Sequence, residues 1–212
     1  MRSIETNKGT YEFKELVFEL GVKKIDMEIS KQNLLTVKKC FDQYNLTFGL
    51  LYGTLLGAIR ENNFIEHDED TDTFILEEDR ELLLSTLFEL RDLGFEVGRY
   101  VDDLLSIVKD GEYIDIYIYK RLNKNTRTNG GYVIDANYLE NLVDYKLFGV
   151  NFKIPNNAEK LLVILYGNDW RIPDENGKPR NYGNYMKLRN YIKDNFSFLF
   201  VIISFMKKKL HV

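Results

Sequence analysis

The chain has 212 residues, of which 44% are apolar and 29% charged, the proportions of one ordinary globular domain. Its 29 Lys and Arg residues face 33 Asp and Glu residues, and the net charge of -4 excludes the strongly basic composition of a nucleic-acid-binding protein. The one cysteine, Cys40, cannot form an internal disulfide, and the sequence shows neither a signal-peptide core nor an apolar run of the roughly 20 residues that a membrane span needs. We therefore expect a cytoplasmic protein with no nucleic-acid partner.

No repeat, low-complexity tract or linker divides the chain, which predicts one domain over residues 1–195 and a distinct tail over 196–212. The tail begins with a mostly apolar run, 196–206, and continues with three lysines, 207–209. An apolar patch beside basic residues fits peripheral contact of 196–209 with the inner face of the cytoplasmic membrane. It fits equally well a terminal helix packed on the domain, with the lysines at its C-terminal end.

A helix is expected first, because Ser30 is a suitable N-cap for an amphipathic segment whose apolar stripe recurs every three or four residues: Leu34, Val37, Phe41 and Tyr44. The apolar run 46–52 predicts a strand. It meets a tight turn at Gly53-Thr54, which opens a second helix containing Leu55, Leu56 and Ile59.

Further along, 73–76 predicts a strand, and a helix carrying Leu83, Leu87 and Leu90 should end at Gly94. Residues 95–100, 104–108 and 113–119 predict three strands, the last two joined by an Asp110-Gly111 hairpin. The final strand alternates, so that the isoleucines share one face and Asp115 shares the other with three tyrosines. After an irregular polar stretch, Asn157 can cap a helix that Gly167 ends.

The most informative residues are Asp68, Asp70 and Asp72. In an extended segment, positions i, i+2 and i+4 project from one face about 6 to 7 Å apart, so the three carboxylates should converge. Such a cluster repels itself unless a cation neutralises it, and oxygen ligands of this kind suit Mg²⁺ or Mn²⁺ better than zinc. Asp115 would be a fourth acid if its strand lies beside this segment, which predicts a site for metal-assisted phosphoryl chemistry.

An alternative interpretation is that 66–72 is only a solvated acidic loop. The preceding segment argues against it. Gly53 and Thr54 at the start of a helix expose backbone N–H groups that can bind a phosphate, and Gly57 permits close approach. Arg60 adds a bidentate phosphate donor one turn further along.

Three separated motifs resemble those of the LicD family, phosphocholine-type transferases related to fukutin-related protein. The first joins Tyr52-Gly53-Thr54-Leu55-Leu56-Gly57-Ala58-Ile59-Arg60 to Phe64-Ile65 and the acidic run from His67 to Asp72. The second is Ile114-Asp115-Ile116, and the third combines 154–159 with 166–170 and Pro173. The resemblance therefore extends from about residue 46 to residue 173.

The resemblance implies a nucleotidyltransferase-like α/β (α+β) fold, with a mixed β-sheet flanked by helices. By position, Gly53 and Thr54 would hold donor phosphate, Asp68, Asp70 and Asp72 would bind the metal, and Asp115, the further acid, would be a fourth metal ligand. The family usually has Trp before an Asp-Asp-Asp-Ile-Asp run, whereas this chain has His67, Glu69 and Thr71. Because Glu69 and Thr71 alternate to the opposite face, the principal acids remain and activity is expected.

The implied reaction moves a phospho-alcohol from a CDP-linked donor, such as CDP-choline, to a hydroxyl of a cell-surface glycan that could be lipid-linked. Asp70, Asp72 and Asp115 would be the catalytic acids, and the metal together with Arg60 would neutralise the departing CMP. An aromatic cage for choline could use Tyr113, Tyr117, Tyr119 or Trp170; without one, the donor could be CDP-ribitol or CDP-glycerol.

Two other functions remain open. One is a nucleotidyltransferase that moves NMP from an NTP to a small hydroxyl compound. The other is a catalytically silent module that binds a nucleotide or glycan, against which the clustered carboxylates argue.

Overall fold

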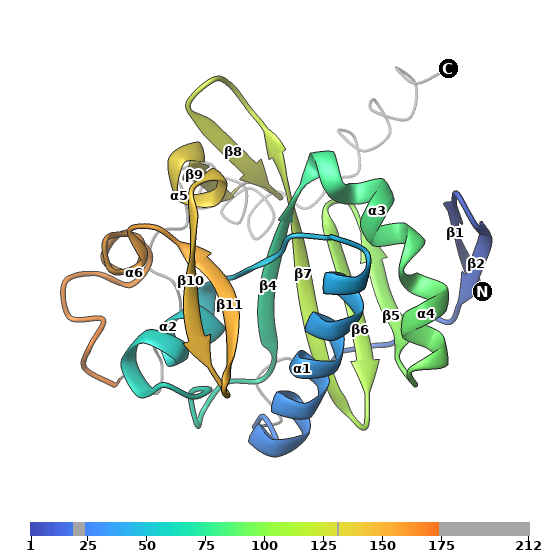
Figure 1. Ribbon diagram of the computed structural model, residues 1–212, viewed down its shortest axis with the longest axis horizontal. Helices are drawn as coiled ribbons and strands as arrows, with labels where there is room; N and C mark the ends of the chain where they lie inside the picture. Colours follow the sequence, from blue (N-terminus) through green and yellow to red (C-terminus); the bar gives the residue numbers. More distant parts are fainter. Residues whose placement is uncertain (19–23, 131, 174–212) are drawn as a thin grey trace, which may run out of the picture.

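The computed structural model describes residues 1–18, 24–130 and 132–173. Their main feature is one mixed sheet of nine strands in the order β10-β11-β3-β4-β7-β6-β5, with β8 paired to β7 and β9 paired to β8 (Figure 1). The strands are β3 (Gly49–Leu50), β4 (Thr71–Leu76), β5 (Glu96–Val101), β6 (Leu104–Lys109), β7 (Glu112–Arg121), β8 (Thr126–Asn129), β9 (Tyr132–Asp135), β10 (Leu142–Leu147) and β11 (Val150–Pro155). The expected mixed α/β architecture is confirmed.

The centre of the sheet is the parallel pair β4 and β7, in which Asp72 lies opposite Asp115. Strands β6 and β5 continue the sheet in antiparallel fashion, and Ser106 of β6 lies opposite Asp115. Because residues in register on neighbouring strands share a face, this pairing brings the acids of two distant sequence segments together.

The helices are α1 (Met27–Gln43), α2 (Tyr52–Glu61), α3 (Arg80–Ser85), α4 (Leu87–Asp92), α5 (Ala136–Glu140) and α6 (Ala158–Tyr166), with a short 3-10 turn at Glu77–Asp79. Helix α1 packs across β7 (Figure 1). Its Ser30 Oγ donates to Glu112 Oε2 at 3.4 Å, so α1 lies over the face of β7 that also carries the buried Ile114 and Ile116. Asp115 therefore lies on the other face, as the alternation predicted.

The helix starts differ from the predictions. Ser30 is buried inside α1, and the N-cap is Asp26, whose side chain accepts from the N–H groups of Glu28 and Ile29 at 3.1 Å each. The predicted strand 46–52 is reduced to Gly49–Leu50, and α2 begins at Tyr52. Gly53 and Thr54 therefore belong to the first turn of α2 rather than to a turn that precedes it.

Other predicted elements are confirmed with shifted ends. Strands β5, β6 and β7 form where expected, and Asp110 and Gly111 both have the positive φ of a tight hairpin. Gly94 follows α4, and Gly167 ends α6, but Thr86 divides the expected helix 83–94 into α3 and α4. Asn157 precedes α6 without a side-chain cap bond.

Sequence patterns missed the hairpin of β1 (Arg2–Thr6) and β2 (Gly9–Phe13), and the polar stretch after β7 contains β8, β9, α5, β10 and β11. No helix in the described part of the chain has both the length and the apolar character needed to cross a bilayer. The predicted tail 196–212 lies outside the described residues.

The corrected N-cap of α1 gives a stability test. We expect Asp26→Ala to lower the free energy of unfolding by about 1 kcal/mol, because two N–H groups of the first turn lose their acceptor. Asp26→Asn keeps an acceptor oxygen and should change the free energy of unfolding by less than about 0.5 kcal/mol. Urea denaturation measures both, and equal losses in the two variants would contradict the assignment.

Candidate functional site

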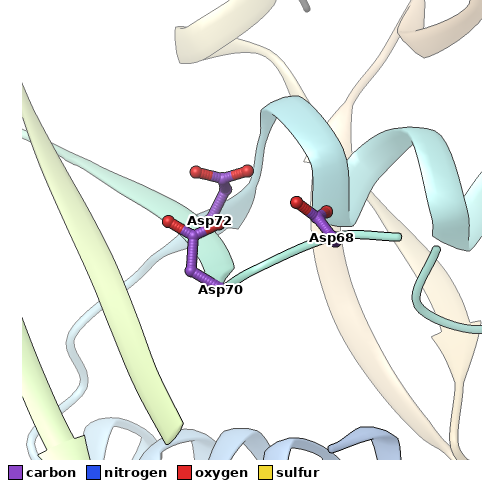
Figure 2. A group of neighbouring side chains, drawn as sticks. All are labelled: Asp68, Asp70 and Asp72. Carbon is purple, nitrogen blue, oxygen red and sulfur yellow. The ribbon is translucent and has the colours of Figure 1, made fainter. Parts of the chain in front are cut away.

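Three aspartates converge at the entry to β4. Asp68, Asp70 and Asp72 each offer a carboxylate oxygen, and these oxygens lie within 4.8 Å of one another. Figure 2 shows the three side chains on the same side of the segment that leads into β4, beside α2. Asp72 is buried, and Asp68 and Asp70 are half-buried. The convergence predicted from the i, i+2, i+4 spacing is thus present in the structure.

The first turn of α2 holds Asp72 in place. The Gly53 N–H donates to Asp72 Oδ2 at 2.9 Å, and the Thr54 hydroxyl accepts from the Asp72 N–H at 2.8 Å. Thr54 is almost fully buried, with 1% of its surface exposed. The groups expected to bind donor phosphate therefore bind the carboxylate and backbone of Asp72 here.

Gly53 is required by the close approach of Asp68. A Cβ built on Gly53 would lie 2.1 Å from Asp68 Oδ2, well inside van der Waals contact. The absence of a side chain at residue 53 thus lets α2 and the acidic segment share one site.

Burial and mutual repulsion raise the pKa values of these acids. Burial raises the pKa of Asp68 to about 6. The pKa values of Asp70 and Asp72 are raised well above the usual range by burial and then by neighbouring carboxylates, Asp115 for Asp70 and Asp70 for Asp72. The charged forms are disfavoured in the protein by itself, so a cation at this site would be bound in exchange for protons.

Asp115 lies beside this group but is held by other partners. Arg99 Nη2 donates to both of its carboxylate oxygens, at 2.9 and 3.1 Å, and Ser106 Oγ donates to Oδ1. Neither Arg99 nor Ser106 was a candidate, because each is an ordinary strand residue until the sheet places it beside Asp115.

The other two predicted substrate-binding residues, Gly57 and Arg60, contact groups other than the acids. Gly57 lies against the backbone of residues 63–65, and a Cβ at this position would lie 2.5 Å from the Asn63 carbonyl oxygen. Arg60 lies seven residues after Gly53 on α2, about 10 Å along the helix axis. Its guanidinium donates to Glu61 and to the carbonyl of Trp170, so the structure does not bring it to the acids as the sequence suggested.

A group of tyrosines adjoins α2. Tyr52 begins that helix with a φ of 43°, a left-handed conformation that costs free energy in a bulky residue. Its hydroxyl bonds that of Tyr119 at 2.5 Å, and its ring packs on Tyr117 and Tyr132 at centroid distances of 5.0 and 5.7 Å. These contacts fix the residue that precedes Gly53, a role that sequence analysis did not assign.

The four aromatic residues considered for a choline cage occupy different surroundings. Tyr117 and the buried Tyr119 contact Tyr52. Tyr113 packs on Phe18 at 4.8 Å, and Trp170 is buried beneath the Arg171 guanidinium.

Two glycines on α2 give a paired test. In Gly53→Ala the new methyl meets only the end of a side chain, so Asp68 should turn away while the melting temperature falls by less than about 3 °C. In Gly57→Ala the new methyl group meets backbone atoms of residues 63–65, which cannot turn aside, so the free energy of unfolding should fall by about 1 to 3 kcal/mol. Thermal melts and Mn²⁺ titrations distinguish them: Gly53→Ala should weaken Mn²⁺ binding at least about tenfold. Unchanged Mn²⁺ affinity in Gly53→Ala would contradict this account.

Comparison with solved structures shows what the fold is similar to. The solution structure of the antibiotic-resistance factor ANT(2'')-Ia superposes with a TM-score of 0.50 and 11% identity, over 87% of this chain and 98% of that one. The crystal structure of the lincosamide antibiotic adenylyltransferase LnuA with lincomycin bound gives a TM-score of 0.45 and 16% identity, over 62% and 84%. At these identities the likeness concerns the fold alone.

Comparison with curated proteins finds no significant match. The model of one protein family, described as LicD/FKTN/FKRP, nucleotidyltransferase domain, matches residues 45–157. This match covers more than half of the 212 residues and includes α2, all three converging aspartates and Asp115. The chain therefore belongs to the LicD/FKTN/FKRP family and carries its nucleotidyltransferase domain.

Proposed function

We propose that this protein is a metal-dependent transferase that moves a phospho-alcohol from a CDP-linked donor to a hydroxyl of a glycan. The observation that carries the proposal is the group of three carboxylates within 4.8 Å of one another, inside the matched family domain. Family membership supports a transferase, and the donor and acceptor classes follow the resemblance of the sequence motifs. CDP-choline is the first donor to test.

The residues present suit a hard divalent cation. Asp68, Asp70 and Asp72 offer only carboxylate oxygens, the ligands preferred by Mg²⁺ and Mn²⁺. Burial is the largest cause of the raised pKa values of all three, so a bound cation would relieve a real electrostatic cost. When bound, the cation would polarise the phosphoryl group and neutralise charge on the leaving phosphate.

The protein groups would then bind and orient the reactants. The acceptor oxygen would form a bond to the phosphorus that carries the alcohol, the bond from that phosphorus to CMP would break, and CMP would leave. The hydroxyl proton would pass to a carboxylate of the site, for which Asp70, Asp72 and Asp115 are the candidates. Arg60 has no part in this scheme, because its guanidinium is bound at the far end of α2.

The proposed cation site makes stability depend on pH. A carboxyl whose folded pKa is raised binds more protons in the folded than in the unfolded state. The metal-free protein should therefore lose stability as pH rises from about 4 through 6, where Asp68 ionises, and further above that range, where Asp70 and Asp72 ionise. Saturating Mn²⁺ at pH 7.5 should raise the melting temperature by about 5 °C or more.

Differential scanning fluorimetry checks both effects. Asp70→Asn should melt at a higher temperature than the wild type without metal, because it removes repulsion, and should lose the Mn²⁺ shift. The matched control, Glu66→Gln, neutralises an exposed acid of the same segment and should keep the shift. An equal Mn²⁺ shift in Asp70→Asn would show that the cation binds elsewhere.

Product analysis tests the reaction. With Mg²⁺, a hydroxyl acceptor panel and CDP-choline, CDP-ribitol or CDP-glycerol, the protein should release CMP, and Asp70→Asn and Asp72→Asn should reduce the rate at least about 1000-fold. Release of pyrophosphate from an NTP would instead indicate NMP transfer. Donor binding without either product would indicate a binding module.

A further inference from the structure

One row of polar side chains crosses four strands beneath the acidic site. Arg99 on β5 lies opposite Ser106 on β6, Ser106 lies opposite Asp115 on β7, and Asp115 lies opposite Asp72 on β4. Since residues in register share a face, the row ends at the aspartate that α2 holds. Arg99 thus belongs to the site although it is 16 residues from Asp115 in sequence.

Arg99 is held on several sides. Its Nη2 donates to both carboxylate oxygens of Asp115, and its Nε donates to Ser106 Oγ at 3.0 Å. The guanidinium carbon of Arg99, Cζ, lies over the ring of Phe18, 4.8 Å from the ring centroid. The backbone N–H of Leu16 anchors this segment to Gly98 O at 2.8 Å. A guanidinium fixed in this way keeps its orientation when neighbouring groups change.

The ion pair with Arg99 limits the ability of Asp115 to bind a cation. Its side chain is 5% exposed and both of its oxygens already accept from Arg99, so it has little freedom to turn toward a cation. Among the described residues, none of the other three aspartates forms an ion pair; Asp72 accepts from the Gly53 N–H, and Asp68 accepts from the Glu69 N–H. Burial is the largest cause of the raised pKa of Asp70, and Arg99 is the positive charge that acts against it.

We propose that Arg99 is a positioning residue that keeps Asp115 out of the cation's ligand set and offsets its charge. The inference rests on the proposed cation site at Asp68, Asp70 and Asp72. It narrows the expectation from sequence, in which Asp115 was a fourth ligand: three carboxylates bind the cation, and the fourth stays paired with Arg99.

Mn²⁺ affinity measured by calorimetry on the full chain tests this without an activity assay. Arg99→Gln removes a positive charge and releases Asp115, so Mn²⁺ should bind about 5- to 10-fold more tightly. Arg99→Lys keeps the charge and should stay within about twofold of the wild type. A merely structural role for Arg99 would instead weaken binding in Arg99→Gln.

Asp115→Asn supplies an independent arm. It leaves Arg99 without its carboxylate, so Mn²⁺ binding should weaken by about 5- to 10-fold, whereas Asp70→Asn, which removes a ligand, should weaken it by about 100-fold or more. The double variant Arg99→Gln with Asp115→Asn should return to within about twofold of the wild type, because the two charge changes cancel.

The Mn²⁺ affinities of these variants separate a failure of the Arg99 proposal from a failure of the cation site. Unchanged or weaker Mn²⁺ binding in Arg99→Gln, or a loss in Asp115→Asn as large as that in Asp70→Asn, would overturn this inference while leaving the cation site intact. Wild-type protein that binds no Mn²⁺, or Asp70→Asn that binds it as tightly, would overturn the proposed function and this inference together.

Discussion

Repulsion among half-buried carboxylates is the constraint around which this site is built. Asp68, Asp70 and Asp72 lie too close together, and too far from water, to ionise at their ordinary pKa values. A fold retains such a cluster only if other interactions hold it in place. Here the first turn of α2 supplies two hydrogen bonds to Asp72, and the missing side chain of Gly53 leaves room for Asp68.

The sheet provides the second part of the arrangement. The parallel register of β4 and β7 places Asp115 beside Asp72, and the antiparallel strands β6 and β5 bring Ser106 and Arg99 to Asp115. One acid is thereby paired with a cationic side chain of the protein, whereas the three converging aspartates have no such partner among the described residues. The same geometry relates two distant sequence motifs of the matched family domain, the segment 52–72 and the strand that carries Asp115, to a single charged site.

The convergence of Asp68, Asp70 and Asp72 could be predicted from sequence because side-chain alternation is a local rule, although only Asp72 lies within β4 and Asp70 lies at a bend before it. The alternation of β7 likewise placed Asp115 correctly. Arg99 and Ser106 could not be predicted, because their role depends on a register between strands that no local pattern specifies. The helical pattern of 52–61 was recognised, but the position of Arg60 relative to the acids depended on where α2 begins. Strands β8 to β11 were missed because they are short and mix polar with apolar residues, and because polar residues such as Arg127 and Asn129, although buried in the structure, resemble loop composition in the sequence.

The central claim is that the three converging aspartates hold protons that a divalent cation displaces. Calorimetric titration with Mn²⁺ at pH 6, in two buffers of different ionisation enthalpy, counts those protons directly. With the pKa of Asp68 raised to about 6 and those of Asp70 and Asp72 raised further, we expect release of at least about one proton per bound ion. Mn²⁺ binding that releases no proton would contradict the account.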